Sequence, residues 1–290
     1  MVQKIPERLI YSLIAIFSLS LSIFFRKKAL LIGILPLELL LQFIVISAII
    51  LTLNLFLFQK KYFKKIKKIT HLQWCFIFFA GTFLLAAFSF SLFGLRLTTS
   101  VNYSFITRSS LIFTTILAYF FLKEKMPREK LLLIFSFFIG IYLVTTGGKI
   151  IIPQVGDLLI LIGAFSFSSF SIVQKKLSTH LPPEVVSWGV TLSSAVLAIL
   201  TGFLLKVNFC PTNGFIFILL VGLAEALMIL FMNKTMRIAD VTYYVMMTML
   251  IPIVNGFLGF IFLNELLNFI QILGGFILII SGILAQRLKS

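Results

Sequence analysis

The sequence is poor in the residues on which soluble enzymes and secreted scaffolds depend. Its 290 residues include only nine acidic residues, two cysteines and two histidines. The lone pair Cys75 and Cys210 matches no disulfide framework, and no Cys/His spacing typical of a zinc site is present. No histidine–aspartate pair, metal-ligand spacing or Gly-rich phosphate loop occurs. These absences argue against an enzyme active site and against ATP-driven chemistry, and we expect no cofactor.

Apolar residues dominate instead. They make up 60% of the chain, with 34 phenylalanines and a mean hydropathy of +1.12. A soluble domain could not bury that much apolar surface. The formal charge of +16 would suit nucleic acid, but the basic residues lie between apolar runs, where membrane proteins carry them. We therefore expect an all-α integral membrane protein that does not bind nucleic acid.

About 20 apolar residues cross a bilayer as a helix, and lipid leaves helices as the expected form. Ten stretches qualify, and the connections between them are short. The predicted spans are 8–26, 36–58, 72–94, 99–121, 131–147, 156–175, 185–205, 213–233, 241–263 and 268–286.

The basic residues are distributed unequally between the two sides of these spans. With the N-terminus inside, 18 of the 25 Lys and Arg fall on the inner side and six on the outer side. This bias predicts a multi-pass protein of the cell inner (plasma) membrane with both termini in the cytoplasm. The basic run 59–68 is interpreted as a topology anchor on anionic lipid, with a regulatory or ligand-binding role as the alternative.

The chain repeats itself. "YFFLKEK" at 119–125 returns as "FIFLNEL" at 260–266, and "IFSLSLSIFFRKK" at 16–28 resembles "AFSFSSFSIVQKK" at 164–176. The pairs matched at an offset of 141 are Gly81 and Gly222, Arg96 and Arg237, Tyr103 and Tyr244, Thr107 and Thr248, and Glu124 and Glu265. We predict two five-helix units, 1–150 and 151–290.

An odd number of spans per unit turns the second unit upside down. Its copy of the glutamate then faces outward, where lysines would oppose insertion, so "KEKMPREK" is replaced by "NELLNFIQ". Inverted repeats are a hallmark of secondary transporters, whose two halves exchange conformations around a central site. The alternative, chance similarity between apolar helices, does not account for polar residues matched in register.

The second unit also carries a family pattern. Its stretch 249–284 contains Pro252, Glu265, Gly274 and Gly282, and the first unit has the corresponding Glu124 and Gly140. With ten spans in two halves, the chain resembles the EamA-type transporters of the drug/metabolite transporter superfamily. The first unit departs from the pattern, because Leu111 stands where Pro252 stands in the second and Arg108 is an unusual addition.

The resemblance implies transport of a small metabolite through a central cavity lined mainly by spans 1, 3, 4, 6, 8 and 9. Related transporters carry amino acids, drugs or S-adenosylmethionine, and the glutamates of the repeated motif look structural. Rival interpretations are an exporter of drugs or other metabolites with the same fold, a membrane-embedded enzyme, and a lipid scramblase without a solute cavity.

Two charges lie in mid-span, where they are costly and usually functional. Arg108 and Glu225 are roughly 14 Å and 18 Å into their spans at the helical rise per residue. They could bind the opposite charges of a zwitterionic or cationic substrate such as an amino acid or S-adenosylmethionine. Glu225 could also carry a coupled proton. Alternatively the two residues form an ion pair that joins spans 4 and 8, and the two roles are compatible.

Further polar residues at helical spacing extend this candidate site. Tyrosines could stack on a ring or cation, with core packing as the alternative. Besides lipid and substrate we expect no obligatory partner, and a monomer is the default. The additional candidate residues are Tyr103, Ser104 and Thr107 on span 4, Tyr244, Thr248 and Asn255 on span 9, and Ser18 and Ser22 on span 1.

Overall fold

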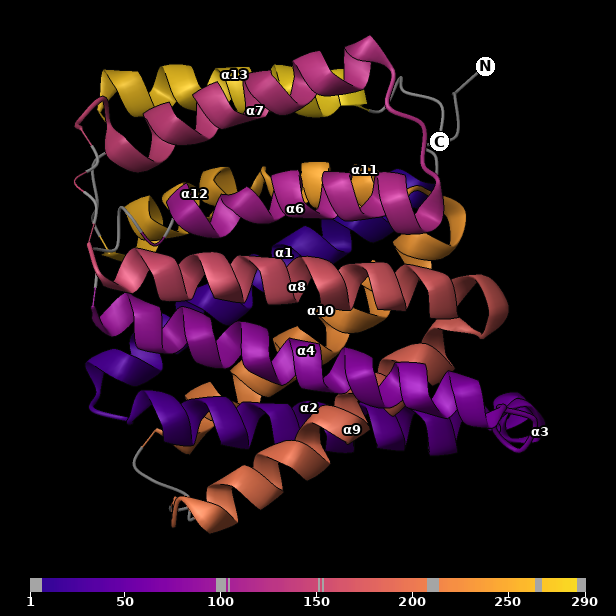
Figure 1. Cartoon of the computed structure of the whole chain (residues 1–290). Coiled ribbons are helices and arrows are strands. Elements are labelled where there is room, and N and C mark those ends of the chain that lie inside the picture. Colours follow the sequence, from indigo (N-terminus) through magenta and orange to yellow (C-terminus); the bar gives the residue numbers. More distant parts are fainter. Residues whose placement is uncertain are drawn as a thin grey trace.

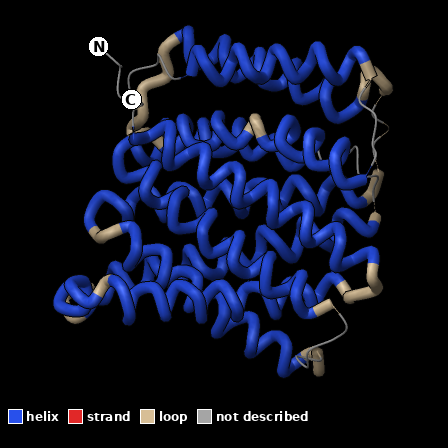
Figure 2. The backbone as a smooth tube through the Cα atoms, turned by 180° about the vertical axis from the view of Figure 1, so that it is seen from behind, coloured by secondary structure: helices blue, strands red, loops and turns tan. Residues whose placement is uncertain are grey.

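The computed structural model describes residues 7–97, 103, 105–150, 152, 154–207, 214–263 and 268–285. These residues form helices and contain no strand (Figures 1 and 2). The elements of the first half are α1 (Glu7–Leu31), α2 (Pro36–Phe58), η1 (Lys60–Tyr62), α3 (Phe63–Ile66), α4 (His71–Arg96), η2 (Thr107–Ser109), α6 (Ser110–Leu117), η3 (Ala118–Leu122) and α7 (Arg128–Thr146). Those of the second half are α8 (Gly156–His180), α9 (Pro183–Leu204), α10 (Phe215–Ile238), α11 (Val241–Thr248), α12 (Ile251–Leu263) and α13 (Phe269–Ala285).

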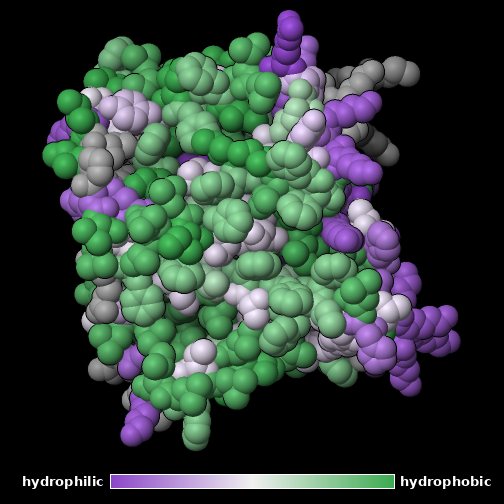
Figure 3. Space-filling model, in the orientation of Figure 1, coloured by the Kyte–Doolittle hydropathy of each residue, from purple (hydrophilic) through white to green (hydrophobic). Residues whose placement is uncertain are grey.

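Eight helices of the described part are long and apolar enough to cross a membrane. Two shorter apolar stretches, Thr107–Leu122 and Phe269–Ala285, lie where the fourth and tenth spans are predicted. Helices α2, α4, α7 and α8 run along one common direction, and α1, α9 and α10 cross it obliquely (Figure 1). Apolar side chains cover the flank of the molecule, and hydrophilic ones gather at the end that carries α3 (Figure 3). The chain is thus an all-helical, multi-pass membrane protein.

The first span is longer than its apolar run. We expected it to end at residue 26, but α1 continues to Leu31 and takes Arg26, Lys27 and Lys28 into the helix. Gly33 ends it, because its left-handed φ of 93° lets Ile34 N–H reach the carbonyl of Ala29 at 3.2 Å. The prediction was wrong at this boundary, since a hydropathy count stops at the first charge whereas a helix can continue past it.

Helices of the two halves interlock. α1 packs on α10, α4 on α8, α2 on α9, α7 on α13 and α6 on α11. Each of these pairs takes one helix from each half of the sequence. The main interfaces of the protein therefore lie between the two halves rather than within either one.

The α7–α13 pair illustrates how closely these helices approach. A Cβ on Gly274 would lie 2.8 Å from the carbonyl oxygen of Gly140, and a Cβ on Gly140 would lie 3.1 Å from that of Gly274. Ser136 and Ser281 share a hydrogen bond of 2.8 Å across the same interface. Small residues permit such backbone contact, and dispersion together with polar contacts stabilises helix pairs in lipid. The glycines of the family pattern thus serve packing.

Candidate functional site

A charged pair lies at the interface of α1 and α10. The guanidinium of Arg26 donates to Oε1 of Glu225 in a short hydrogen-bonded ion pair. Ser22, one helical turn earlier on α1, donates its hydroxyl to the same oxygen at 2.6 Å. The side chain of Glu225 is 1% exposed and that of Arg26 is 14% exposed. A carboxylate buried this deeply requires such partners, because its desolvation is otherwise too costly.

Two aromatic rings complete the surroundings of Arg26. Its guanidinium carbon lies 4.4 Å from the ring centroid of Phe43 on α2 and 4.7 Å from that of Phe88 on α4. These distances place the cation over both ring faces, where the quadrupole of an aromatic ring attracts it. Helices α1, α2, α4 and α10 therefore converge on this single charge.

Some polar atoms of the pair remain unused. Nε of Arg26 and Oε2 of Glu225 are both buried and have no hydrogen-bond partner in the structure. Buried polar atoms are nearly always hydrogen-bonded, and exceptions point to a functional group or a bound molecule. One donor and one acceptor are thus available beside the ion pair.

Arg108 is not the partner of Glu225. The ion pair between them, which was the alternative to substrate binding, does not form, and Arg26, 199 residues from Glu225 in the sequence, is the partner instead. Arg108 lies in η2 and is half-buried, with its Nε buried and lacking a hydrogen-bond partner. Within the described residues, no ion pair to Arg108 is found. The alternative prediction, an ion pair of Arg108 with Glu225 that joins spans 4 and 8, was therefore wrong, because Glu225 pairs with Arg26 on span 1.

The fourth helix of each half is interrupted at the same relative position. Thr107–Ser109 forms a 3₁₀ turn in the first half, and α11 ends at Thr248 before α12 begins at Ile251 in the second. Arg108 and Met249 are 141 residues apart, the offset of the repeat. Pro252 has no N–H to continue the helical ladder, which explains the second interruption. Discontinuous helices mark the binding sites of many transporters.

Two tyrosines lie near the central charges. The hydroxyl of Tyr103 is within electrostatic range of both Arg26 and Arg108. Tyr244 is fully buried within electrostatic range of Glu225, and its hydroxyl donates to the sulfur of Met228 at 3.8 Å. We refer to Ser22, Arg26, Tyr103, Arg108, Glu225 and Tyr244 as the central cluster.

The other predicted residues have local roles or lie apart. The hydroxyls of Thr107 and Thr248 bond to their own helices, at the carbonyls of Tyr103 and Val245, over 2.9 Å and 2.7 Å. Asn255 on α12 is half-buried, and its Oδ1 has no partner. Ser18 is buried on α1, one turn before Ser22. Ser104 lies outside the described residues.

Arg26 is the functional candidate that sequence reasoning missed. We counted it as an outer-loop charge because it follows an apolar run in "FFRKK". Helical spacing offered a signal, since Ser18, Ser22 and Arg26 recur every four residues and therefore share one face of a helix. Continuing that stripe past the apolar run would have placed the arginine beside the serines.

A second polar group occupies the lysine-rich end, by which we mean the end bearing α3 and residues 123–130. Glu124 accepts from the N–H of Val241 at 2.8 Å and from the hydroxyl of Thr242 at 2.7 Å, so it caps the start of α11. Lys130 lies 3.4 Å from Glu124 and 3.5 Å from Asp240. The glutamate of the repeated motif is therefore structural in the first half, as the family resemblance implied. Its counterpart Glu265 lies outside the described residues.

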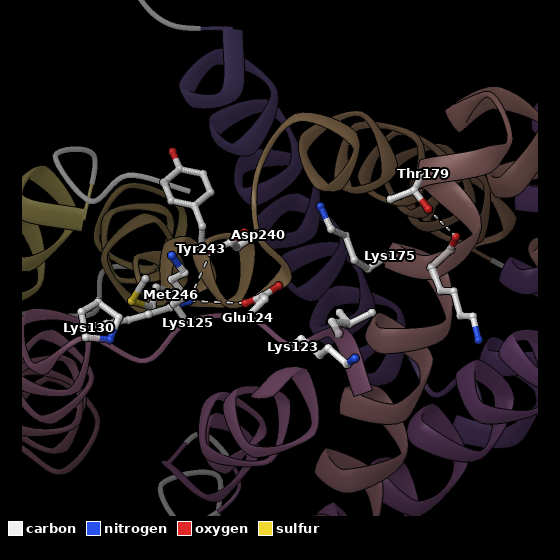
Figure 4. Close-up of a pocket in the computed structure, with 12 residues that line it drawn as sticks. Lys123, Glu124, Lys125, Lys130, Lys175, Thr179, Asp240, Tyr243 and Met246 are labelled. Atoms are coloured by element: carbon white, nitrogen blue, oxygen red, sulfur yellow. Dashed lines mark hydrogen bonds and ion pairs between the residues drawn. The ribbon is translucent and has the colours of Figure 1, made fainter. Parts of the chain in front are cut away.

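This polar group forms the wall of a cavity of about 600 Å³ (Figure 4). Lys175 lines it and donates to the carbonyls of Met236 and Ala239, at 2.6 Å each. Five lysines and two acidic residues line the cavity, which gives it a positive surplus. They are Lys123, Lys125, Lys130, Lys175, Lys176, Glu124 and Asp240.

The model of the EamA-like transporter family matches the chain twice, over residues 8–146 and 154–286. The chain belongs to the EamA-like transporter family. This family is part of the drug/metabolite transporter superfamily, and its members are membrane transporters rather than enzymes. The two matched segments lie on either side of the junction that the internal repeat predicted.

The fold of this chain also occurs among solved structures. One of them, described only as a crystal structure of a protein, superposes with a TM-score of 0.78 over 98% of this chain and 99% of its own. Its sequence identity is 17%, which shows a shared fold and nothing finer. A search of curated proteins finds no significant match.

Proposed function

We propose that this EamA-like protein is a secondary transporter that moves a small metabolite by alternating access. One observation carries the proposal: a cluster of charges lies inside the membrane-spanning region where helices of both halves meet. Intramembrane charges mark substrate and ion pathways. The absence of a nucleotide-binding motif from the sequence makes a gradient or an exchange the energy source.

The interlocked halves support an inverted five-plus-five arrangement. Three of the packed pairs join a span to its own counterpart in the other half: α2–α9, α6–α11 and α7–α13. The other two pairs, α1–α10 and α4–α8, are equivalent to each other, because the repeat relates α1 to α8 and α10 to α4. Such pairing is expected of halves related by a two-fold axis. The hydrophilic surface at the lysine-rich end (Figure 3) favours the cytoplasm for that end, and hence for both termini.

The central cluster favours a substrate with a carboxylate. Arg108 has an unpartnered buried donor, and Oε2 of Glu225 is an unpartnered buried acceptor. In our proposal Arg108 binds the carboxylate and Glu225 an ammonium, so an amino acid is the leading class. S-adenosylmethionine has the same head group and is the cationic alternative. Glu225 is also the proposed carrier of a coupled proton. In this proposal the proton on its carboxylate would replace the ion pair with Arg26.

One chain supplies both halves of the pathway, so we propose a monomer in a lipid bilayer. Counterflow uptake in proteoliposomes tests the function, with labelled amino acids and S-adenosylmethionine as the panel. Uptake that is lost in Glu225→Gln, while the variant remains monodisperse, is the expected result. Uptake unaffected by that change refutes the site, and uptake driven equally without a pH gradient refutes the proton. Absence of uptake for carboxylate-bearing solutes, alongside uptake of sugars or drugs, refutes the substrate class.

A further inference from the structure

The charges of the central cluster are not required by the fold. Arg108, Glu225 and Arg26 correspond in the repeat to Met249, Leu84 and Gln174, respectively. All three counterparts are fully or almost fully buried and uncharged. The positions that the repeat makes equivalent are thus buried without an ionic group. Three charges whose repeat counterparts are all uncharged therefore reflect a specific use, and their sum is +1.

The surplus charge belongs to Arg108. Glu225 already receives Arg26 and Ser22 on one oxygen, so that carboxylate is neutralised by its own neighbour. Arg108 has no ion pair with any carboxylate of the described residues, and its Nε is buried without a partner. Arginine cannot lose its proton, and an uncompensated charge at membrane depth is expensive. The site is one negative charge short of neutrality.

The backbone around Arg108 suits a bound group. It lies at the 3₁₀ interruption of its span, and the second half is interrupted at the equivalent turn. Interruptions free main-chain groups from helical hydrogen bonds at the depth where transporters bind substrate. Nearby on the same two spans, the side-chain oxygens of Thr114 and Asn255 occupy equivalent positions and are both buried without partners. Polar groups are therefore available on both sides of the pseudo-symmetric pair.

The cavity at the lysine-rich end carries a net positive charge, as the central cluster does. Lys130 and Lys175 are engaged by Glu124, Asp240 and backbone carbonyls. The remaining lysines of the cavity wall, Lys123, Lys125 and Lys176, are exposed and form no ion pair with an acidic residue in the part of the chain that the structure describes. A cavity lined by one sign of charge raises the local concentration of ions of the opposite sign.

We infer that the transported substrate carries a net negative charge, and that Arg108 binds its surplus carboxylate or phosphate group. The inference rests on the proposed function and narrows its substrate class. An acidic amino acid satisfies both ends of the site, since its ammonium meets Oε2 of Glu225 and leaves one negative charge for Arg108. A neutral zwitterion leaves the site at +1, and a cation raises it to +2.

Binding to the purified full chain tests this without requiring transport. L-Glutamate, L-glutamine and L-lysine form a series of similar size and falling negative charge, and succinate and inorganic phosphate separate the carboxylate from the phosphate. We expect glutamate to bind at least about tenfold more tightly than glutamine, with lysine weakest. Arg108→Gln should abolish that preference, which is a change of about 1.4 kcal/mol for a factor of ten. Arg108→Lys should retain it, and Lys67→Gln, an exposed charge change outside both cavity and cluster, should leave it unaltered.

The outcomes separate the two proposals. Equal or tighter binding of glutamine or lysine overturns the anionic class, even if counterflow shows transport. Anion binding that requires Arg108, together with no counterflow, upholds the anion site and refutes the transporter. If no soluble anion binds, and anionic lipid instead stabilises the parent but not Arg108→Gln, the counter-ion is a lipid headgroup and the inference is overturned. Loss of binding in the Lys67→Gln control would likewise overturn it, because bulk charge would then suffice.

Discussion

The ion pair between Arg26 and Glu225 makes a quantitative prediction possible. Arg26→Met removes the cation and leaves a 1%-exposed carboxylate with Ser22 as the remaining donor among the described residues. Breaking a buried pair from one side costs about 3–5 kcal/mol. We therefore expect Arg26→Met to lose about 3–5 kcal/mol in the free energy of unfolding.

The double variant Arg26→Met/Glu225→Leu supplies the test of mechanism. Leucine is the residue at the equivalent position of the other half, Leu84, where it is buried. Replacing both charges by apolar groups is often nearly neutral, so the double variant should recover to within about 1 kcal/mol of the parent.

Equilibrium unfolding in mixed micelles measures these differences. The pair Lys234–Glu184, with an N–O separation of 3.8 Å and side chains 28% and 12% exposed, is the matched control. Its rupture should cost less than about 1 kcal/mol. If the double variant of the central pair is as unstable as the sum of its single variants, the two charges are not coupled and the reasoning fails.

Three further predictions concern packing and caps, all read from thermal unfolding of the purified chain. Gly274→Ala should lower the free energy of unfolding by about 1–3 kcal/mol, because its Cβ would meet backbone atoms of α7 at 2.8 Å. The control Gly275→Ala, whose Cβ would meet nothing within 4 Å, should be neutral or stabilising. Equal effects of the two changes would refute the close approach. Glu124→Gln should lower the free energy of unfolding by about 1–3 kcal/mol, because it weakens the buried hydrogen bonds to the start of α11. Lys125→Gln, on the same loop, should change it little. A larger loss in Lys125→Gln would contradict the capping role of Glu124. Lys123→Gly should raise the free energy of unfolding by about 1 kcal/mol, because the φ of 56° at this residue is left-handed and favours glycine. A loss of stability would show that the lysine side chain matters more than the backbone.

Much of the architecture was predictable from local patterns. Apolar runs of about 20 residues located the long helices, because lipid leaves the chain few other ways to satisfy its backbone. The interruption before Pro252 followed from the missing N–H of that residue. The interruption around Arg108 carries no proline, so only the structure shows that the helix is interrupted there, at the position equivalent to the break before Pro252.

Boundaries and partners were less predictable. The end of α1 at Leu31 was missed because a hydropathy count treats every charge as a boundary. A charge can stay inside a helix when another segment supplies its counter-ion, and that segment lies almost 200 residues away in the sequence. Ser104, Glu265 and Cys210 lie outside the described residues.

The sequence by itself determined the membrane environment, the helical class, the repeat and the side on which the lysines gather. These properties follow from composition and from patterns within one segment, where solvent and hydrogen-bonding constraints act locally. Only the tertiary structure decided that Glu225 pairs with Arg26 and leaves Arg108 in surplus. By charge alone, either Arg26 or Arg108 could neutralise the carboxylate of Glu225. The packing of α1 against α10 selects one of them, because a charge-assisted hydrogen bond forms only over a few ångströms.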